Sequence, residues 1–251
     1  GPFDLIVLSG ILNRDFDLCV LDAMQERLTP DETIQRVLNH APDAIVFLTG
    51  AVSFTEDFAL LRRIRESSSK PPVLVGTGDC LLAEGEKFFR EYPFLDAAIQ
   101  SFISDDVASW LKGEERVFEN LSWRRSDGSI VTGARALLKE EFCLPLPRFD
   151  LFPIKKYRIP HGVRLPYAGI LTDYGCPFHC DYCIGGELGF RLRNLENVIE
   201  EMHELKRIGI RELWIKDLTF GVNRKRTFTL LERMRSEKLG FTWVCLSRAN
   251  V

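Results

Sequence analysis

Three of the chain's seven cysteines, Cys176, Cys180 and Cys183, fall within eight residues. The gaps between them are three residues and then two residues. A closed structural zinc site takes four ligands, commonly as two spaced pairs, and the neighbouring His179 is awkwardly placed to be a fourth. A four-iron, four-sulfide (4Fe-4S) cluster held by three thiolates, with one iron left open for a small molecule, accounts for three cysteines and no more. The cluster is therefore the preferred interpretation, and zinc is the alternative.

The stretch TDYGCPFHCDYC, residues 172–183, resembles the signature of the radical S-adenosylmethionine (SAM) enzymes, including the aromatic Tyr182 before the last cysteine. The resemblance covers most of residues 163–251. It implies that SAM binds the open iron and is cleaved reductively to methionine and a 5'-deoxyadenosyl radical. It also implies an electron donor such as flavodoxin or ferredoxin, and a small-molecule or natural-product substrate.

The same resemblance suggests five residues as SAM contacts: Tyr182, Lys216, Asp217, Thr219 and Arg248. Tyr182 is expected beside the adenine, the next three at the end of the second barrel strand, and Arg248 at the end of the third. Capping or surface contacts explain Lys216, Asp217 and Thr219 equally well, and a salt bridge within the barrel explains Arg248. The sequence identifies no catalytic acid or base.

Short apolar runs alternate with amphipathic stretches on both sides of the chain's middle, which predicts parallel sheets covered by helices. In the first part, strands are expected at residues 17–23, 43–50, 71–79 and 95–102, and helices at 3–16, 29–41, 58–68, 81–92 and 104–113. In the second part, strands are expected at residues 167–175, 212–217 and 241–249, and helices at 194–209 and 223–240.

Residues 114–162 break this rhythm and mark a boundary between domains. They contain a hairpin with Asp127 and Gly128 as its turn, followed by a proline-rich linker. We therefore predict three parts: residues 1–113, an α/β domain whose first strand is expected to be missing; residues 114–162, the hairpin and linker; and residues 163–251, a domain expected to stop in mid-barrel.

An α/β domain, a proline-rich connector and a cysteine-bearing strand resemble the radical SAM subgroup with an N-terminal cobalamin (B12)-binding domain. This resemblance implies a doubly wound Rossmann-like domain, followed by the first half of a partial (β/α)6 TIM-like barrel. The corrin would lie at the C-terminal ends of the parallel strands. The matching positions are Thr49, Gly50, Ser53, Gly76, Thr77 and Gly78. Ordinary turns explain the same residues, and Ser101 and Phe102 stand where the family usually has a glycine and an acidic turn.

The resemblances together imply a cobalamin-dependent radical SAM enzyme, with methyl transfer to an unactivated carbon as the first interpretation. A cyclase, a rearrangement enzyme or a carbon–carbon coupling enzyme with the same domains is the alternative. A non-catalytic metal-binding module is a third hypothesis, from a different class.

The composition favours no charged macromolecule as a partner. Lys and Arg number 33 against 36 Asp and Glu, for a formal charge of -3, so no nucleic-acid partner is expected. The chain has no apolar run as long as the roughly 20 residues that a membrane span requires, and its N-terminus lacks the order of a signal peptide. Four scattered cysteines, Cys19, Cys80, Cys143 and Cys245, do not form a disulfide framework. A cytoplasmic protein is expected.

Overall fold

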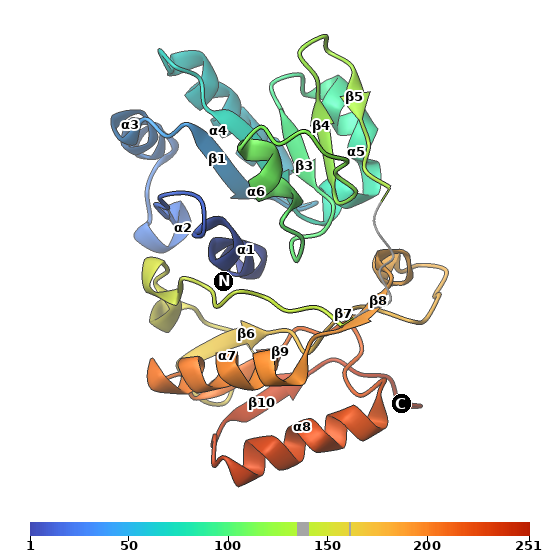
Figure 1. Cartoon of the computed structure of the whole chain (residues 1–251). Helices are drawn as coiled ribbons and strands as arrows, with labels where there is room; N and C mark the ends of the chain where they lie inside the picture. Colours follow the sequence, from blue (N-terminus) through green and yellow to red (C-terminus); the bar gives the residue numbers. More distant parts are fainter. Residues whose placement is uncertain (135–140, 161) are drawn as a thin grey trace. The chain divides into compact units, whose positions relative to one another are not determined.

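The computed structural model describes residues 1–134, 141–160 and 162–251. The chain divides into two compact units, one formed by Pro2–Ala136 and the other by Leu137–Val251 together with Gly1 (Figure 1). Parts of the predicted linker, residues 135–140 and 161, lie outside the described residues.

The first unit is built on a five-stranded sheet in the order β1-β2-β3-β4-β5. Its first three strands are parallel, as their apolar runs predict, and they correspond to three of the expected strands. The predicted hairpin is present and forms the last two strands: β4 pairs antiparallel with β3, and β5 pairs antiparallel with β4. The strands are β1 (Ala44–Leu48), β2 (Val73–Thr77), β3 (Ala97–Ile99), β4 (Leu121–Arg124) and β5 (Ile130–Val131).

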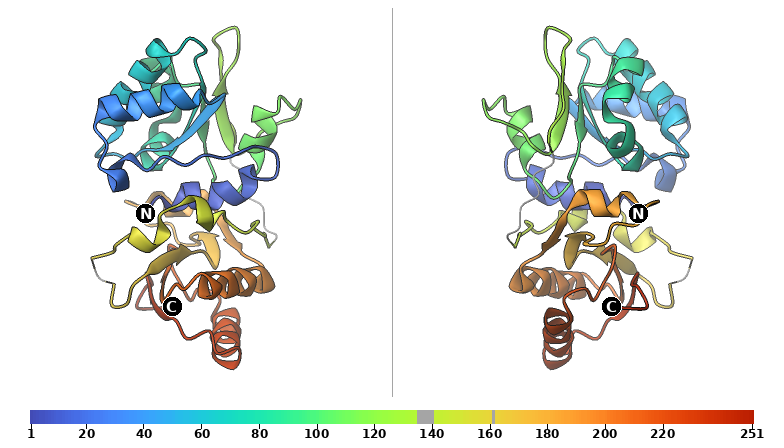
Figure 2. Two further views of the ribbon diagram at one scale, coloured as in Figure 1. Left: turned by 90° about the vertical axis from the view of Figure 1, so that its left-hand side faces the viewer. Right: turned by 90° about the vertical axis from the view of Figure 1, so that its right-hand side faces the viewer.

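The helices of this unit correspond to the predicted ones, except for the short α2, which was not predicted. They are α1 (Phe3–Leu12), α2 (Ala23–Glu26), α3 (Pro30–His40), α4 (Phe54–Ser67), α5 (Asp79–Glu91) and α6 (Asp106–Leu111). Helix α3 begins with a capping box, in which Thr29 and Glu32 satisfy each other's backbone N–H groups. In Figures 1 and 2, α4 and α5 lie on one side of the sheet and α6 lies on the other. Helices on both faces agree with the predicted α/β class.

The prediction of a strand at residues 17–23 is wrong. No strand is formed there, and residues 17–22 have no regular structure. The Asp22 carboxylate instead accepts a hydrogen bond from the backbone N–H of Gln25 and caps α2. An aspartate side chain that bonds to the backbone two or three residues on favours a helix start over a strand ladder, which explains why the short apolar run does not decide the local structure.

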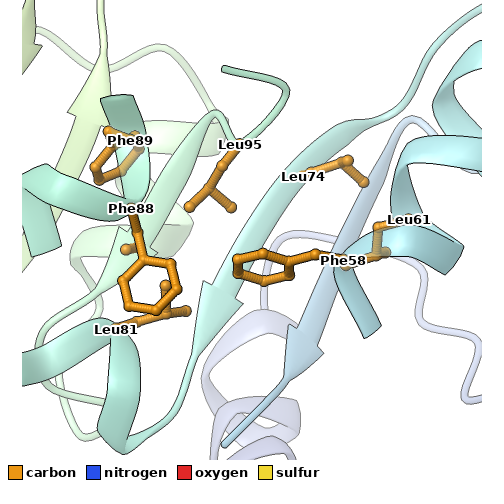
Figure 3. Close-up of a cluster of buried hydrophobic side chains, with 8 residues drawn as sticks. Phe58, Leu61, Leu74, Leu81, Phe88, Phe89 and Leu95 are labelled. Carbon is orange, nitrogen blue, oxygen red and sulfur yellow. The ribbon is translucent and has the colours of Figure 1, made fainter. Parts of the chain in front are cut away.

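The core of the first unit lies between helices α4 and α5 and the sheet. Phe58 from α4 packs edge-on against Phe88 from α5, with 5.8 Å between the ring centroids. Leu74 from β2 is fully buried in the same cluster (Figure 3). The cluster comprises Phe58, Leu61, Leu74, Leu81, Phe88, Phe89, Leu95 and Ala98. These side chains fix both helices on one face of β2 and β3, and so set where each loop leaves its strand.

The second unit contains a parallel sheet in the order β10-β9-β6. Its strands are β6 (Tyr167–Ile170), β9 (Glu212–Ile215) and β10 (Thr242–Cys245), connected through α7 (Leu195–Arg207) and α8 (Arg224–Ser236). Both helices lie on the same face of this sheet (Figures 1 and 2), as expected for right-handed crossover connections. Apart from the strand expected at residues 167–175, the predicted strands and helices of this half are therefore present.

One predicted strand of the second unit differs from expectation. Residues 167–175 form two strands, because β6 ends at Ile170 and β7 (Asp173–Gly175) turns away to pair antiparallel with β8 (Phe190–Leu192). Behind this hairpin, the guanidinium of Arg193 is fully buried and forms an ion pair of 2.5 Å with Glu201 of α7. Across the described part of the chain, no helix is long and apolar enough to cross a membrane.

Candidate functional site

The cysteine loop is closed at its base by the β7–β8 hairpin. The backbone N–H of Cys176 donates to the carbonyl of Gly189, at 3.0 Å. Gly175 has a φ of +78°, and a Cβ at this position would collide with the Gly189 carbonyl oxygen. Since only glycine tolerates both conditions, the two glycines hold the ends of the loop in close contact.

Within the loop, two of the cysteines lie close to Gly185. A Cβ on Gly185 would be 3.3 Å from the Sγ of Cys183 and 3.5 Å from the Cβ of Cys176. The backbone N–H of Cys183 donates to the carbonyl of Cys180, at 3.0 Å. All three thiols are free; Cys176 is buried, Cys180 is half-buried and Cys183 is exposed. Among the described residues, no three His, Cys, Asp or Glu side chains are grouped to hold a single metal ion.

Each cysteine sulfur has a polar neighbour. The hydroxyl of Thr219 lies 3.4 Å from the Sγ of Cys176. The backbone N–H of Gly185 donates to the Sγ of Cys183 at 3.4 Å, and the guanidinium of Arg248 donates to the Sγ of Cys180 at 3.7 Å. Three free thiols on one loop, each close to a hydrogen-bonding group, are suited to bind iron as thiolates.

Asp217 at the end of β9 fixes the backbone that leads into the cysteine loop. Its buried carboxylate accepts hydrogen bonds from the backbone N–H of Thr172 at 2.7 Å and of Asp173 at 3.2 Å, and from the Thr172 hydroxyl at 2.5 Å. These bonds explain why β6 ends at Ile170 and the chain turns into β7. Asp217 is thus a positioning residue for the loop.

A second carboxyl group, that of Asp173, is buried beside Asp217. Burial, together with the charge of the neighbouring Asp217, raises the pKa of Asp173 to about 9, while Arg226 opposes the shift. Burial also raises the pKa of Asp217. Among the described residues, Asp173 Oδ1 has no hydrogen-bond partner. Burial of two neighbouring carboxyl groups favours a proton on the pair at neutral pH, and the larger rise of the pKa is at Asp173.

The structure brings some of the expected SAM residues to the loop and gives others different contacts. Thr219 and Arg248 contact cysteine sulfurs. Tyr182 is on the loop and its side chain is 92% exposed. The Lys216 ammonium lies 3.8 Å from the centre of the Trp214 ring, and Asp217 bonds to the backbone. All five stay predictions as SAM contacts.

Two loop residues were not among the predicted site residues. The ring of Phe178 stacks under the guanidinium of Arg248 at 4.2 Å, and Gly185 lies between two of the cysteines. The position of Phe178 between the first two cysteines does not indicate a contact with Arg248. The position of Gly185 could have indicated its role, since a glycine two residues after the last cysteine leaves room for the sulfurs.

The residues suggested for cobalamin lie together at the carboxyl ends of β1 and β2. The backbone N–H of Thr49 donates to the carbonyl of Thr77 at 3.0 Å. Gly78 has a φ of +132°, and a Cβ there would collide with the Thr49 carbonyl oxygen. Gly50 faces the Asp79 carboxylate, and Gly76 pairs with Phe47 in the sheet. The glycines therefore let the two loops approach each other closely.

Asp57 in the first turns of α4 orients two hydroxyl groups at this end of the sheet. Its Oδ2 accepts hydrogen bonds from Thr49 at 2.7 Å and from Ser53 at 2.8 Å. Ser101, just after β3, is buried, and its hydroxyl has no hydrogen-bond partner among the described residues. A buried hydroxyl without a partner at the carboxyl ends of parallel strands, where such sheets bind ligands, fits a polar ligand group. Asp57 and Ser101 were not predicted for this site.

No family model matches the chain. An uncharacterized methyltransferase of Pyrococcus horikoshii is 29% identical over 99% of the chain and 55% of its own length. The hopanoid C-2 methylase of Rhodopseudomonas palustris is 33% identical over 34% of the chain and 17% of its own length. The chain spans about half the length of the first of these curated relatives.

Two solved structures share the fold. The radical SAM methyltransferase TsrM of Kitasatospora setae, solved with cobalamin and a [4Fe-4S] cluster, matches 94% of the chain and 50% of its own length, at 17% identity and a TM-score of 0.71. OxsB, a cobalamin-dependent SAM radical enzyme solved with aqua-cobalamin and SAM, matches 87% of the chain and 31% of its own length, at 19% identity and a TM-score of 0.68. These two matches show that the chain has the same fold as two radical SAM enzymes that were solved with cobalamin.

Proposed function

We propose that the chain is part of a cobalamin-dependent radical SAM enzyme that transfers a methyl group to an unactivated carbon. The observation that carries this proposal is the loop of three free thiols, Cys176, Cys180 and Cys183, each facing a hydrogen-bond donor. The similarity to a methyltransferase over nearly the whole chain supports methyl transfer as the reaction.

In this proposal the first unit is a doubly wound, cobalamin-binding-type Rossmann domain, and the second unit is the first half of a partial (β/α)6 barrel. The parallel strands β1-β2-β3 and β6-β9-β10 support these assignments. The boundaries at residues 113 and 162 are also predictions.

Two cofactor sites follow from the residues present. Cys176, Cys180 and Cys183 would hold a 4Fe-4S cluster, which supplies the electron that cleaves SAM to methionine and a 5'-deoxyadenosyl radical. Asp217 and the Gly175–Gly189 contact hold the loop in shape for that cluster. In the first unit, Thr49, Ser53 and Ser101 would offer hydroxyl groups to the cobalamin, with Asp57 orienting the first two.

Methyl transfer consumes SAM in two ways, and the products distinguish it from other radical reactions. Donation of the methyl group leaves S-adenosylhomocysteine, whereas radical formation leaves 5'-deoxyadenosine and methionine. The test is to incubate the intact protein, reconstituted with iron, sulfide and hydroxocobalamin, with SAM and a chemical reductant, and to quantify both products. A methyltransferase forms both, and formation of neither contradicts the proposal.

Two cysteine variants make this assay specific for the loop. Cys180→Ala removes one proposed cluster ligand and is expected to abolish 5'-deoxyadenosine. Cys143→Ala removes an exposed thiol outside the loop and is expected to leave the product yield unchanged. Equal yields from the two variants would contradict the assignment of the cluster to this loop.

A second candidate function is a radical conversion without methyl transfer, such as a cyclisation or a ring rearrangement. The fold match to OxsB, a cobalamin-dependent SAM radical enzyme, is compatible with it. This function predicts 5'-deoxyadenosine without S-adenosylhomocysteine in the same assay.

A further inference from the structure

The three sulfurs of the cysteine loop receive hydrogen bonds from three separate segments of the second unit. Thr219 follows β9, Gly185 is within the loop itself, and Arg248 follows β10. The donor–sulfur distances are 3.4 Å for Thr219 and Gly185, and 3.7 Å for Arg248. Since each donor faces a different cysteine, no sulfur of the three is left without one.

The direction of these hydrogen bonds is fixed once the thiols become iron ligands. A cysteine that binds iron is a thiolate and has no proton to donate. The Thr219 hydroxyl must then donate to the Sγ of Cys176, although in the thiol form either group could be the donor. The Gly185 N–H and the Arg248 guanidinium are donors in either state.

Thr219 is well placed to influence its sulfur strongly. Its side chain is only 4% exposed, and that of Cys176 is 9% exposed. A hydrogen bond in a region with little water is electrostatically stronger than one at the surface. The Thr219–Cys176 contact is therefore a buried interaction that solvent does not replace when the hydroxyl is removed.

Arg248 reaches its sulfur from an exposed position, but an aromatic ring fixes its direction. The guanidinium carbon lies 4.2 Å from the centre of the Phe178 ring, in the same loop as the cysteines. Stacking of this kind holds a guanidinium in place. Arg248 also brings a full positive charge beside Cys180, which favours any state of the site that carries more negative charge.

Hydrogen bonds to the sulfurs and nearby net charge are among the factors that set the reduction potential of an iron–sulfur cluster. We propose that Thr219 and Arg248, with the Gly185 N–H, raise the reduction potential of the cluster held by Cys176, Cys180 and Cys183, and so ease its one-electron reduction. This inference rests on the proposed function, because it requires the cluster to form on this loop.

The test is a redox titration of the intact, reconstituted protein without SAM, with reduction followed by low-temperature EPR and the electron supplied by a chemical reductant. Thr219→Val and Arg248→Gln are each expected to lower the reduced-to-oxidised ratio roughly three- to tenfold at the wild-type midpoint. A tenfold change corresponds to about 59 mV for a one-electron couple. Iron content per chain is measured alongside, to establish that the cluster is intact.

Conservative and matched variants separate tuning from general damage. Thr219→Ser keeps the hydroxyl and is expected to restore the wild-type potential, and Arg248→Lys keeps the charge and is expected to restore part of it. Arg224 is stacked on Phe228 at 5.8 Å in the way that Arg248 is stacked on Phe178. Arg224→Gln and Thr229→Val, which alter α8 instead, are expected to leave the potential unchanged.

Two outcomes would overturn the inference, and they differ in what else they imply. A cluster that forms in all variants with the same potential contradicts the role of Thr219 and Arg248 and leaves the proposed function standing. For Arg248, an unchanged potential would also be expected if this residue contacted only SAM and did not influence the cluster. Failure of the wild-type protein to form any cluster contradicts both the inference and the proposed function.

Discussion

Arg193 and Glu201 form an ion pair of 2.5 Å inside the second unit, where the side chains are 0% and 4% exposed. Arg193 also donates to the carbonyl of Leu171 and to the side chain of Asn197. The pair therefore connects helix α7 to the backbone just before the cysteine loop. Because Arg193 is buried away from water, its charge depends on Glu201 for compensation.

Removing one partner of this pair leaves the other charge buried. Glu201→Gln is expected to lower the free energy of unfolding by about 3–5 kcal/mol, because an uncompensated guanidinium stays in the interior. Chemical denaturation of the apo protein measures this loss. Glu204→Gln, three residues further on, breaks the exposed pair with Arg207 and is expected to have little effect. Similar losses for the two variants would contradict the account of Arg193.

Asp173 is expected to make the stability of the second unit fall as pH rises. Its pKa is raised to about 9 in the folded protein, chiefly by burial, from an ordinary value of 3.8. Between these values the folded state binds a proton that the unfolded state does not, so its contribution to stability is full below about pH 4 and is lost as pH rises toward 9. The slope from this group reaches about 1.4 kcal/mol per pH unit.

Denaturation of the apo protein at several pH values between 5 and 9 tests this expectation. Asp173→Asn keeps an uncharged side chain of the same shape and is expected to flatten the dependence. If the wild-type protein and the variant show the same slope, the proton does not reside on Asp173.

Gly78 is expected to tolerate no side chain. Its φ of +132° is strained for other residues, and a Cβ would also collide with the Thr49 carbonyl oxygen. Gly113 provides a matched control, because its φ of +76° is also positive but nothing lies within 4 Å of its Cβ position. Gly113→Ala is expected to cost about 1–2 kcal/mol, and Gly78→Ala clearly more. Thermal denaturation compares them, and equal losses would show that the contact with Thr49 is not tight.

Asp217 is expected to affect iron binding although it binds no iron. Asp217→Ala removes the acceptor of three hydrogen bonds from Thr172 and Asp173, so the cysteine loop loses its fixed starting point. Iron retained per chain after reconstitution and desalting should fall, with all cysteines intact. Asp150→Ala removes an exposed carboxylate that pairs locally with Arg148 and should leave the iron content unchanged. Full iron content in Asp217→Ala would contradict its positioning role.

Much of the fold could be predicted because the information was local. Apolar runs and helix caps such as Thr29 with Glu32 fall within a few residues of each other, and the elements they predict are present. The strand at residues 17–23 was mispredicted because its apolar residues compete with a local cap at Asp22. The break between β6 and β7 depends on Asp217, about 45 residues away, and no local pattern reveals it.

The candidate site, too, could be predicted only where the information was local. The spacing of Cys176, Cys180 and Cys183 is a local pattern and was sufficient to suggest the resemblance to the radical SAM enzymes, whose fold the chain shares. The contacts of Thr219 and Arg248 with the sulfurs join segments 43 and 68 residues apart. Sequence reasoning marked both residues as functional but could not specify their partners, because partners across a sheet are set by strand order and register.

The most direct test of the account is low-temperature EPR of the intact protein after anaerobic reconstitution with iron and sulfide, and reduction. The account predicts a reduced-cluster signal that changes when SAM is added and is absent in Cys180→Ala. Tightly bound zinc at the cysteine loop, with no cluster signal in the wild-type protein, would contradict it.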